Sequence, residues 1–218
     1  MCFSAAASFT GGAVISAVGV ATQRKVRKPS QRLFAIIPLL FGFQQLAEGL
    51  LWVTLRSGEY TWLQNIATYI FLITALVIWP VMVPISMWFM EEVGKRRKIL
   101  AGLIITGGTL SLFYAICLIF YDVSPQINNF HIQYVDSFPK TLVDIAFVFY
   151  PIPTIVPLFA SSVRRMWVFG ILIAISYIVT GIFFAQYLTS VWCFFAAVIS
   201  VVIYWILNRP KARVHTRA

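Results

Sequence analysis

Runs of apolar residues alternate with short polar segments along the whole chain. The apolar runs cover residues 4–22, 33–55, 61–90, 99–121, 141–160, 166–187 and 188–207. A helix needs about 20 apolar residues to cross the hydrocarbon core of a bilayer, and each run reaches or approaches that length. The pattern therefore predicts an all-α integral membrane bundle of about seven transmembrane helices. We expect one transmembrane domain over residues 1–208 and a basic tail over residues 209–218.

The polar segments alternate in charge, and this alternation predicts the orientation of the chain. Every Lys and Arg except Arg56 and Lys140 lies in the first, third or fifth connecting segment or in the tail. Basic residues near the ends of membrane spans stay on the cytoplasmic side. We therefore expect an odd number of spans in the cell (inner) membrane, with the N terminus extracytoplasmic and the C terminus cytoplasmic.

The composition indicates a membrane protein and argues against a nucleic-acid partner. Hydrophobic residues make up 60% of the chain and charged residues only 11%, whereas about a quarter of the residues of a soluble domain are charged. A net charge of +10 would suggest nucleic-acid binding in a soluble protein. Here the basic residues occupy the positions that set membrane topology, so we expect the lipid bilayer as partner and no nucleic acid.

Small residues and prolines predict how individual helices pack and bend. Small side chains recur every four residues in the first run, at Ser8, Gly12 and Ser16, which is typical of closely packed membrane helices. The third run would measure about 45 Å as a straight helix, so we expect it to tilt, to bend at its two prolines or to end in an interfacial turn. In the fifth run, prolines at 151, 153 and 157 remove three backbone N–H donors, which predicts a break near 151–153.

The second run contains the one acidic residue that lies well inside an apolar stretch, Glu48. Gln45, Glu48 and Trp52 follow one another at spacings of three and four and line one face of a helix, and Gln44 lies four residues before Glu48. A carboxylate in hydrocarbon is costly, so Glu48 should face the bundle interior and find partners. Two interpretations stay open: Glu48 is a hydrogen-bonded structural contact, or it forms a ligand, ion or proton site.

Other polar and reactive side chains fall at a similar depth in the outer half of the bundle. This asymmetry favours an outward-facing polar cavity, and we expect the outer segment 122–140 to cap it. The aromatic members of the set are also typical of an interfacial belt. The candidate ligand-binding residues are Cys2, Gln44, Gln45, Glu48, Trp52, Asn65, Tyr69 and Cys193.

The residues present exclude several kinds of chemistry. No apolar run contains an interior Lys that could form a retinal Schiff base, and the two histidines, His131 and His215, lie outside the runs. Zinc hydrolases and haem proteins need clustered histidines within the membrane. No P-loop or dinucleotide-binding glycine motif is found. We therefore assign no catalytic residue and no metal site, and the sequence leaves the cofactor unknown.

Three stretches carry a family resemblance: MCFSAAASF at the N terminus, FQQLAEGLLW in the second run and SVWCFFAA in the last. They resemble an uncharacterised family of small bacterial multi-pass membrane proteins whose members begin with MCFSA-x-ASF. The resemblance implies a multi-pass membrane fold, and it implies no activity. It draws attention to Cys2, Glu48 and Cys193, which lie in the three stretches.

Three functional hypotheses follow, from different classes, and the third of them is a purely structural or assembly subunit. The favoured one is a non-enzymatic protein that binds or transports a small ligand or ion through the outward-facing cavity around Glu48. The alternative is an intramembrane cysteine-dependent enzyme, or a redox or metal protein, that uses Cys2, Cys193 and Glu48. Under this alternative, Cys2 and Cys193 lie near one another at the outer end of the bundle. The oligomeric state stays open under all three.

Overall fold

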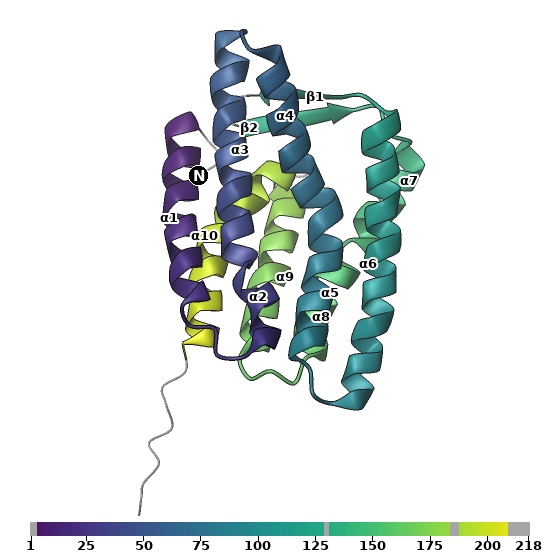
Figure 1. Cartoon of the computed structure of the whole chain (residues 1–218). Coiled ribbons are helices and arrows are strands. Elements are labelled where there is room, and N and C mark those ends of the chain that lie inside the picture. Colours follow the sequence, from purple (N-terminus) through teal and green to yellow (C-terminus); the bar gives the residue numbers. More distant parts are fainter. Residues whose placement is uncertain (1–3, 129–130, 184–187, 209–218) are drawn as a thin grey trace, which may run out of the picture.

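The computed structural model describes residues 4–128, 131–183 and 188–208 and shows a bundle of helices that is closed at one end by a β-hairpin (Figure 1). The first half comprises α1 (Ala5–Gln23), α2 (Arg32–Ala35), α3 (Ile37–Ser57), α4 (Thr61–Leu72) and α5 (Trp79–Met90). The second half comprises α6 (Gly94–Phe120), β1 (Val123–Asn128), β2 (His131–Asp136), α7 (Lys140–Phe149), α8 (Pro151–Ala160), α9 (Met166–Phe183) and α10 (Leu188–Leu207).

The helices agree in length and composition with the predicted membrane spans. Within the described ranges, five helical segments are long and apolar enough to cross a membrane. They are Ala5–Gln23, Pro29–Ser57, Thr61–Met90, Gly94–Phe120 and Lys140–Ala160, and they match the first five apolar runs. The apolar helices α9 and α10 occupy the sixth and seventh runs. Residues 209–218, the predicted tail, lie outside the described residues.

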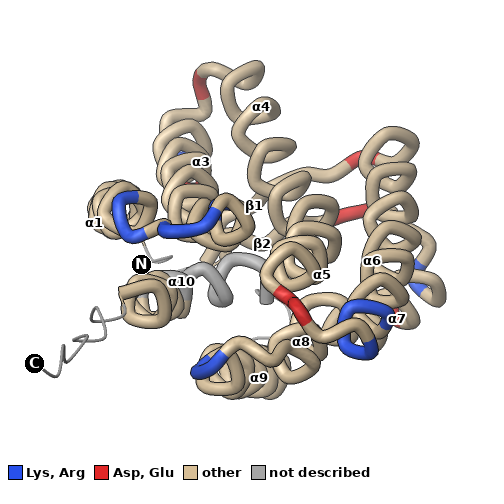
Figure 2. The backbone as a smooth tube through the Cα atoms, turned by 60° about the horizontal axis from the view of Figure 1, so that its bottom comes forward, with Lys and Arg blue, Asp and Glu red and all other residues tan. Residues whose placement is uncertain are grey.

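The basic connecting segments gather at one end of the bundle. Figure 2 brings that end forward and shows Lys and Arg positions in the α1–α2 connection, in the first turn of α6 and in the α8–α9 connection. The hairpin lies at the opposite end (Figure 1). This arrangement is the one that the alternating charges predict for a bundle of antiparallel spans, and we refer to the two ends as the basic end and the hairpin end.

Close packing of α1 against α3 confirms the prediction from the small residues of the first run. A Cβ atom added at Gly42 would lie 2.2 Å from the hydroxyl oxygen of Ser16, and one at Gly12 would lie 2.9 Å from the side chain of Leu46. Ser8 and Gly12 are buried. Small side chains therefore let the two backbones approach where lipid gives no hydrophobic drive for association.

The third span stays helical throughout but changes its winding before Pro80. Residues Ile73–Ile78 form a π-helical turn between α4 and α5. Pro80 has no N–H, and its ring would collide with the carbonyl one turn earlier in a regular α-helix, which explains the wider turn here. Neighbouring helices satisfy carbonyls that this turn exposes: Tyr150 donates its hydroxyl to the carbonyl of Ala75, and Ser111 donates to that of Val77 at 2.7 Å.

The prolines of the fifth span predict a break at residues 151–153, but these residues are helical and begin α8. The helix is interrupted at Tyr150, between α7 and α8, one residue before Pro151. Pro151 cannot donate to the carbonyl of Phe147. That carbonyl instead accepts a hydrogen bond from the hydroxyl of Tyr177 on α9, at 2.9 Å. This hydrogen bond therefore joins α9 to the end of α7 at the interruption.

The outer segment is not a loop but an antiparallel hairpin, so the expectation of a purely α-helical chain needs this correction. Strands β1 and β2 pair in the register Val123↔Asp136 through Asn128↔His131. Ile132 is fully buried and packs with Trp52 and other residues of α3 and α4. The ring of Tyr134 stacks on Phe71 with centroids 5.1 Å apart. As expected, this segment caps the bundle.

Candidate functional site

A cavity of about 270 Å³ lies within the bundle beneath the hairpin. Helices α3, α5, α6, α8 and α9, the π-helical turn and the hairpin all contribute to its lining. An apolar cavity of about 150 Å³ is large enough to hold benzene in another protein. The cavity here therefore has room for a ligand of roughly ten to twelve non-hydrogen atoms on the same scale.

Aromatic side chains form much of the cavity wall. Phe41 stacks on Trp79 with ring centroids 4.3 Å apart, and Phe147 stacks on Tyr177 at 5.6 Å. These stacked pairs hold one another in place, so the wall is preformed. The aromatic lining comprises Phe41, Trp79, Tyr114, Tyr134, Phe138, Phe147, Tyr150, Phe169 and Tyr177.

A few polar groups interrupt this apolar wall, and most of their donors are already used. The indole N–H of Trp79 donates to Oε1 of Gln44 at 3.1 Å, and both side chains are buried. Because an indole only donates, this contact assigns the oxygen of Gln44 and leaves its NH₂ group free of this bond. Thr154 donates to the carbonyl of Tyr150 at 2.7 Å. Asp136 is the acidic residue among the described lining.

A separate buried polar cluster lies further along α3 toward the hairpin end. Glu48 is fully buried, as predicted, and its Oε2 accepts a hydrogen bond from Nε2 of Gln45 at 2.8 Å. Gln45 and Trp52 are also fully buried. Oε1 of Gln45 and Nε1 of Trp52 have no hydrogen-bond partner within the described part of the chain. Buried polar atoms are seldom left unpaired without a functional or structural reason.

The structure brings together some of the predicted ligand-binding residues and separates others. Gln44 lines the cavity, while Gln45, Glu48 and Trp52 form the cluster beyond it on the same helix. Asn65 and Tyr69 are exposed on α4 and do not line the cavity. The buried face of α4 instead carries residues near Ala67 and Phe71, and a shift of two residues on a helix rotates a side chain by about 200°.

The cysteine positions leave the redox hypothesis without structural evidence. Cys2 and the side chain of Cys193 lie outside the described residues, so their proximity stays a prediction. Cys117 is buried and free. No group of three or more His, Cys, Asp or Glu side chains that could hold a metal ion occurs among the residues that the structure describes.

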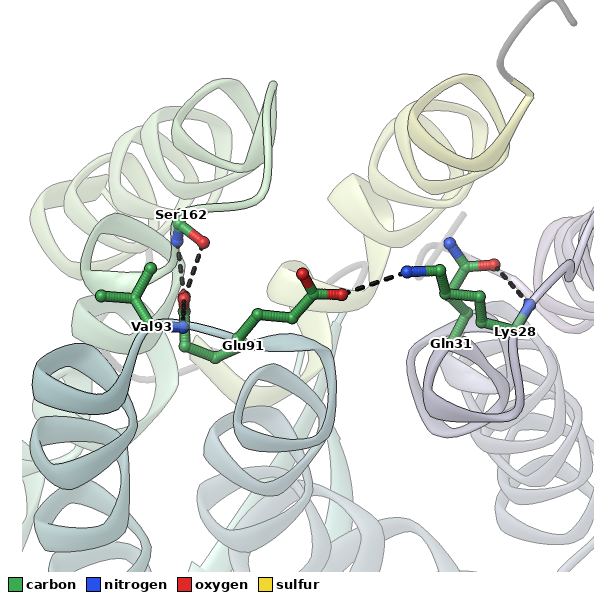
Figure 3. Close-up of polar contacts among 6 residues, drawn as sticks. Lys28, Gln31, Glu91, Val93 and Ser162 are labelled. Atoms are coloured by element: carbon green, nitrogen blue, oxygen red, sulfur yellow. Dashed lines mark hydrogen bonds and ion pairs between the residues drawn. The ribbon is translucent and has the colours of Figure 1, made fainter.

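Glu91, at the basic end, makes a set of hydrogen bonds that the sequence pattern does not predict (Figure 3). The Glu91 carboxylate accepts hydrogen bonds from the backbone N–H and the hydroxyl of Ser162, both at 2.6 Å, and from the N–H of Val93 at 2.9 Å. The contact joins the connection after α5 to the connection after α8. Burial alone would raise the pKa of Glu91, but these hydrogen bonds and the Arg96 charge together lower it. Glu92, its neighbour, forms an exposed ion pair with Lys28 at 3.1 Å.

Glu91→Gln should lower the free energy of unfolding by about 1–3 kcal/mol at neutral pH, because a neutral amide is a weaker acceptor for these donors. The matched change Glu92→Gln should cost at most about 1 kcal/mol, because its ion pair is exposed. The pKa of Glu91 is lower in the folded state, so its ionised form stabilises the fold above the ordinary value of 4.5. The stabilisation by ionised Glu91 should decrease as the pH falls through the pKa of Glu91 in the folded state. The free energy of unfolding of both variants, measured in detergent at several pH values, tests this expectation. Equal effects at the two positions would contradict the assignment.

Comparison with known proteins identifies the family of the chain. No curated protein and no solved structure matches it. A family profile described as "Family of unknown function (DUF6629)" matches residues 1–218, which is the whole sequence. The N-terminal, second-span and last-span stretches that carry the family resemblance all fall within this match. The chain therefore belongs to DUF6629, a family of unknown function, and its site has to be interpreted from its own residues.

Proposed function

We propose that the chain is a seven-span protein of the cell membrane that binds a small ligand in the cavity beneath the hairpin. In this proposal the N terminus and the hairpin lie outside, and the C terminus and the basic end lie in the cytoplasm. The charge distribution supports the orientation, because basic residues near span ends stay cytoplasmic. The hairpin end then presents the cavity to the outside, and the protein needs no catalytic residue.

The cavity itself is the observation that carries this proposal. Creating empty space in a protein core costs about 24 cal/mol per Å³ in another protein, so a cavity of 270 Å³ would cost roughly 6 kcal/mol if it stayed empty. That cost is comparable to the whole stability of a typical domain, about 5–15 kcal/mol. Stacked aromatic pairs and a dedicated hairpin nevertheless preserve the space. A bound ligand would recover much of the lost contact energy.

The cluster of Gln45, Glu48 and Trp52 serves, in this proposal, as the polar end of the ligand site. Its Glu48 follows Gln44 by about one helical turn on the same side of α3. An unpartnered buried polar atom costs about 1–3 kcal/mol, and this cluster has two such atoms within the described residues. A polar group of a ligand or a bound ion could satisfy them. The cysteine-dependent alternative has no comparable observation in its favour.

Photolabelling with phenyl trifluoromethyl diazirine, a small aromatic probe, tests the proposed ligand site. The protein is embedded in phosphatidylcholine nanodiscs, irradiated with the probe and digested, and the labelled residues are mapped by mass spectrometry. We expect labels on buried lining residues such as Trp79, Tyr150 and Phe169, which lipid does not reach. Labels confined to outward-facing residues such as Ile105 and Ile119 would contradict the proposal.

A further inference from the structure

We infer that the ligand of this cavity is an organic cation with an apolar, preferably aromatic, body. The inference rests on the proposed function and specifies the chemical class of the ligand. Three independent properties of the lining lead to it: the charge of its ionisable group, the abundance of aromatic rings, and the direction in which its hydroxyl groups donate.

The first property is an uncompensated negative charge where the cavity approaches the surface. Asp136 is exposed at the base of the hairpin and also lines the cavity. Its Oδ1 accepts the backbone N–H of Phe138 at 3.1 Å, and it makes no ion pair within the described residues. No Lys or Arg is found among the described lining residues. The electrostatic field of the site therefore favours a cation.

The second property is the aromatic wall next to that charge. Tyr134 and Phe138 flank Asp136 in the sequence, and both line the cavity. Tyr114, Phe147 and Tyr177 line it as well. Aromatic rings attract cations through their quadrupoles, and aromatic cages are the usual protein sites for quaternary ammonium groups. The apolar rings also bury the body of the ligand, while the charge stays near Asp136 and water.

The third property is the direction of the hydroxyl hydrogen bonds. Tyr150 donates its hydroxyl proton to the carbonyl of Ala75, Tyr177 donates to that of Phe147, and Thr154 donates to that of Tyr150. These three side chains line the cavity, yet their protons are committed to the backbone. An anionic ligand would need donors in the wall, and these three hydroxyl groups do not supply them, which is compatible with a cation.

A matched pair of compounds tests the charge preference. Benzyltrimethylammonium and neopentylbenzene have the same shape and differ in one positive charge, and both fall in the size range of the cavity. Binding of each is measured by equilibrium dialysis against wild-type protein in phosphatidylcholine nanodiscs, with empty nanodiscs subtracted. We expect saturable binding of the cation that is about tenfold tighter than binding of the neutral compound, as cation–π and acidic contacts allow.

Two variants of the hairpin assign the effect to Asp136. Asp136→Asn keeps an oxygen that can accept the Phe138 N–H and removes the charge. It should weaken binding of benzyltrimethylammonium about tenfold without shifting thermal unfolding. Asp122→Asn removes an equal charge from the base of the same hairpin, at a residue that does not line the cavity, and should leave the affinity within about twofold.

The outcomes separate this inference from the proposed function. Equal binding of the two compounds, or equal effects of Asp136→Asn and Asp122→Asn, would overturn the preference for a cation and leave a ligand cavity. Absence of binding by either compound, with diazirine labels still on the buried lining, would overturn the inference alone. Absence of both the binding and these labels would overturn the inference and the proposed function together.

Discussion

Gly107→Ala is expected to destabilise the protein by about 1–3 kcal/mol or more, although the same change usually stabilises a helix. A Cβ atom at Gly107 would lie 2.0 Å from the carbonyl oxygen of Pro80 and 3.2 Å from Cβ of Pro153. The first contact is with backbone, which cannot rotate away as a side chain can. Helix α6 would have to move from α5 and α8, close to the segments that line the cavity.

The neighbouring glycine supplies the control for this prediction. A Cβ atom at Gly108 would meet no atom of another described helix within 4 Å, so Gly108→Ala should keep only the helix-propensity gain of about 0.5–1 kcal/mol. Thermal unfolding in detergent, followed by circular dichroism, should show shifts of opposite sign for the two variants. Stabilisation by both would show that α6 does not approach Pro80 as closely as the structure indicates.

Glu48→Leu is expected to destabilise the bundle by about 1–3 kcal/mol, whereas Glu48→Gln should leave its stability nearly unchanged. Leucine removes the acceptor that Gln45 uses at 2.8 Å, and the other end of the Gln45 amide already lacks a partner among the described residues. Glutamine retains an oxygen that can accept the same bond. Under the role we propose, Glu48→Gln should still weaken binding of benzyltrimethylammonium, because an NH₂ group replaces one of the two carboxyl oxygens.

Unfolding and dialysis measured on the same two preparations distinguish the roles of Glu48. Destabilisation by Glu48→Gln as large as that by Glu48→Leu would show that the fold depends on a charged carboxylate with a fixed cation. Unchanged stability together with unchanged affinity in Glu48→Gln would reduce Glu48 to a hydrogen-bonding contact within α3. Only reduced affinity at unchanged stability supports a place in the ligand site.

Local patterns in the sequence predicted the helices and several of their irregularities. Apolar length located the five long spans, because a bilayer requires about 20 residues of helix. Proline chemistry predicted an interruption near the one at Tyr150, since a missing N–H affects the helix within one turn, although residues 151–153 themselves are helical. The cost of an exposed carboxylate in hydrocarbon predicted that Glu48 is buried. Each of these inferences needed only neighbouring residues and the properties of the solvent.

The cavity depends on contacts between distant segments, and the sequence pattern could not supply them. Tyr150 and Ala75 are far apart in the chain, yet their hydrogen bond fixes part of the wall. Asp136 is an ordinary polar residue in an outer segment until the hairpin register places it at the cavity. Asn65 and Tyr69 were predicted at the same depth in the membrane as Glu48, but their side chains lie on the exposed face of α4. Depth in the membrane does not define how a helix is rotated about its axis. A strand pattern in 123–136, bounded by polar residues, was the available signal for the hairpin.

Diazirine labelling of an occluded variant tests the ligand cavity most directly. Ala75 is buried and lines the cavity, so Ala75→Phe should fill part of the space, whereas Ala13→Phe adds the same ring to an exposed position on α1. We predict that labels on Trp79, Tyr150 and Phe169 are lost in Ala75→Phe and persist in Ala13→Phe, with equal labelling of outward-facing residues in both. Undiminished labelling of the buried residues in a folded Ala75→Phe variant, or their failure to label in the wild-type protein, would contradict the proposal that this cavity binds a ligand.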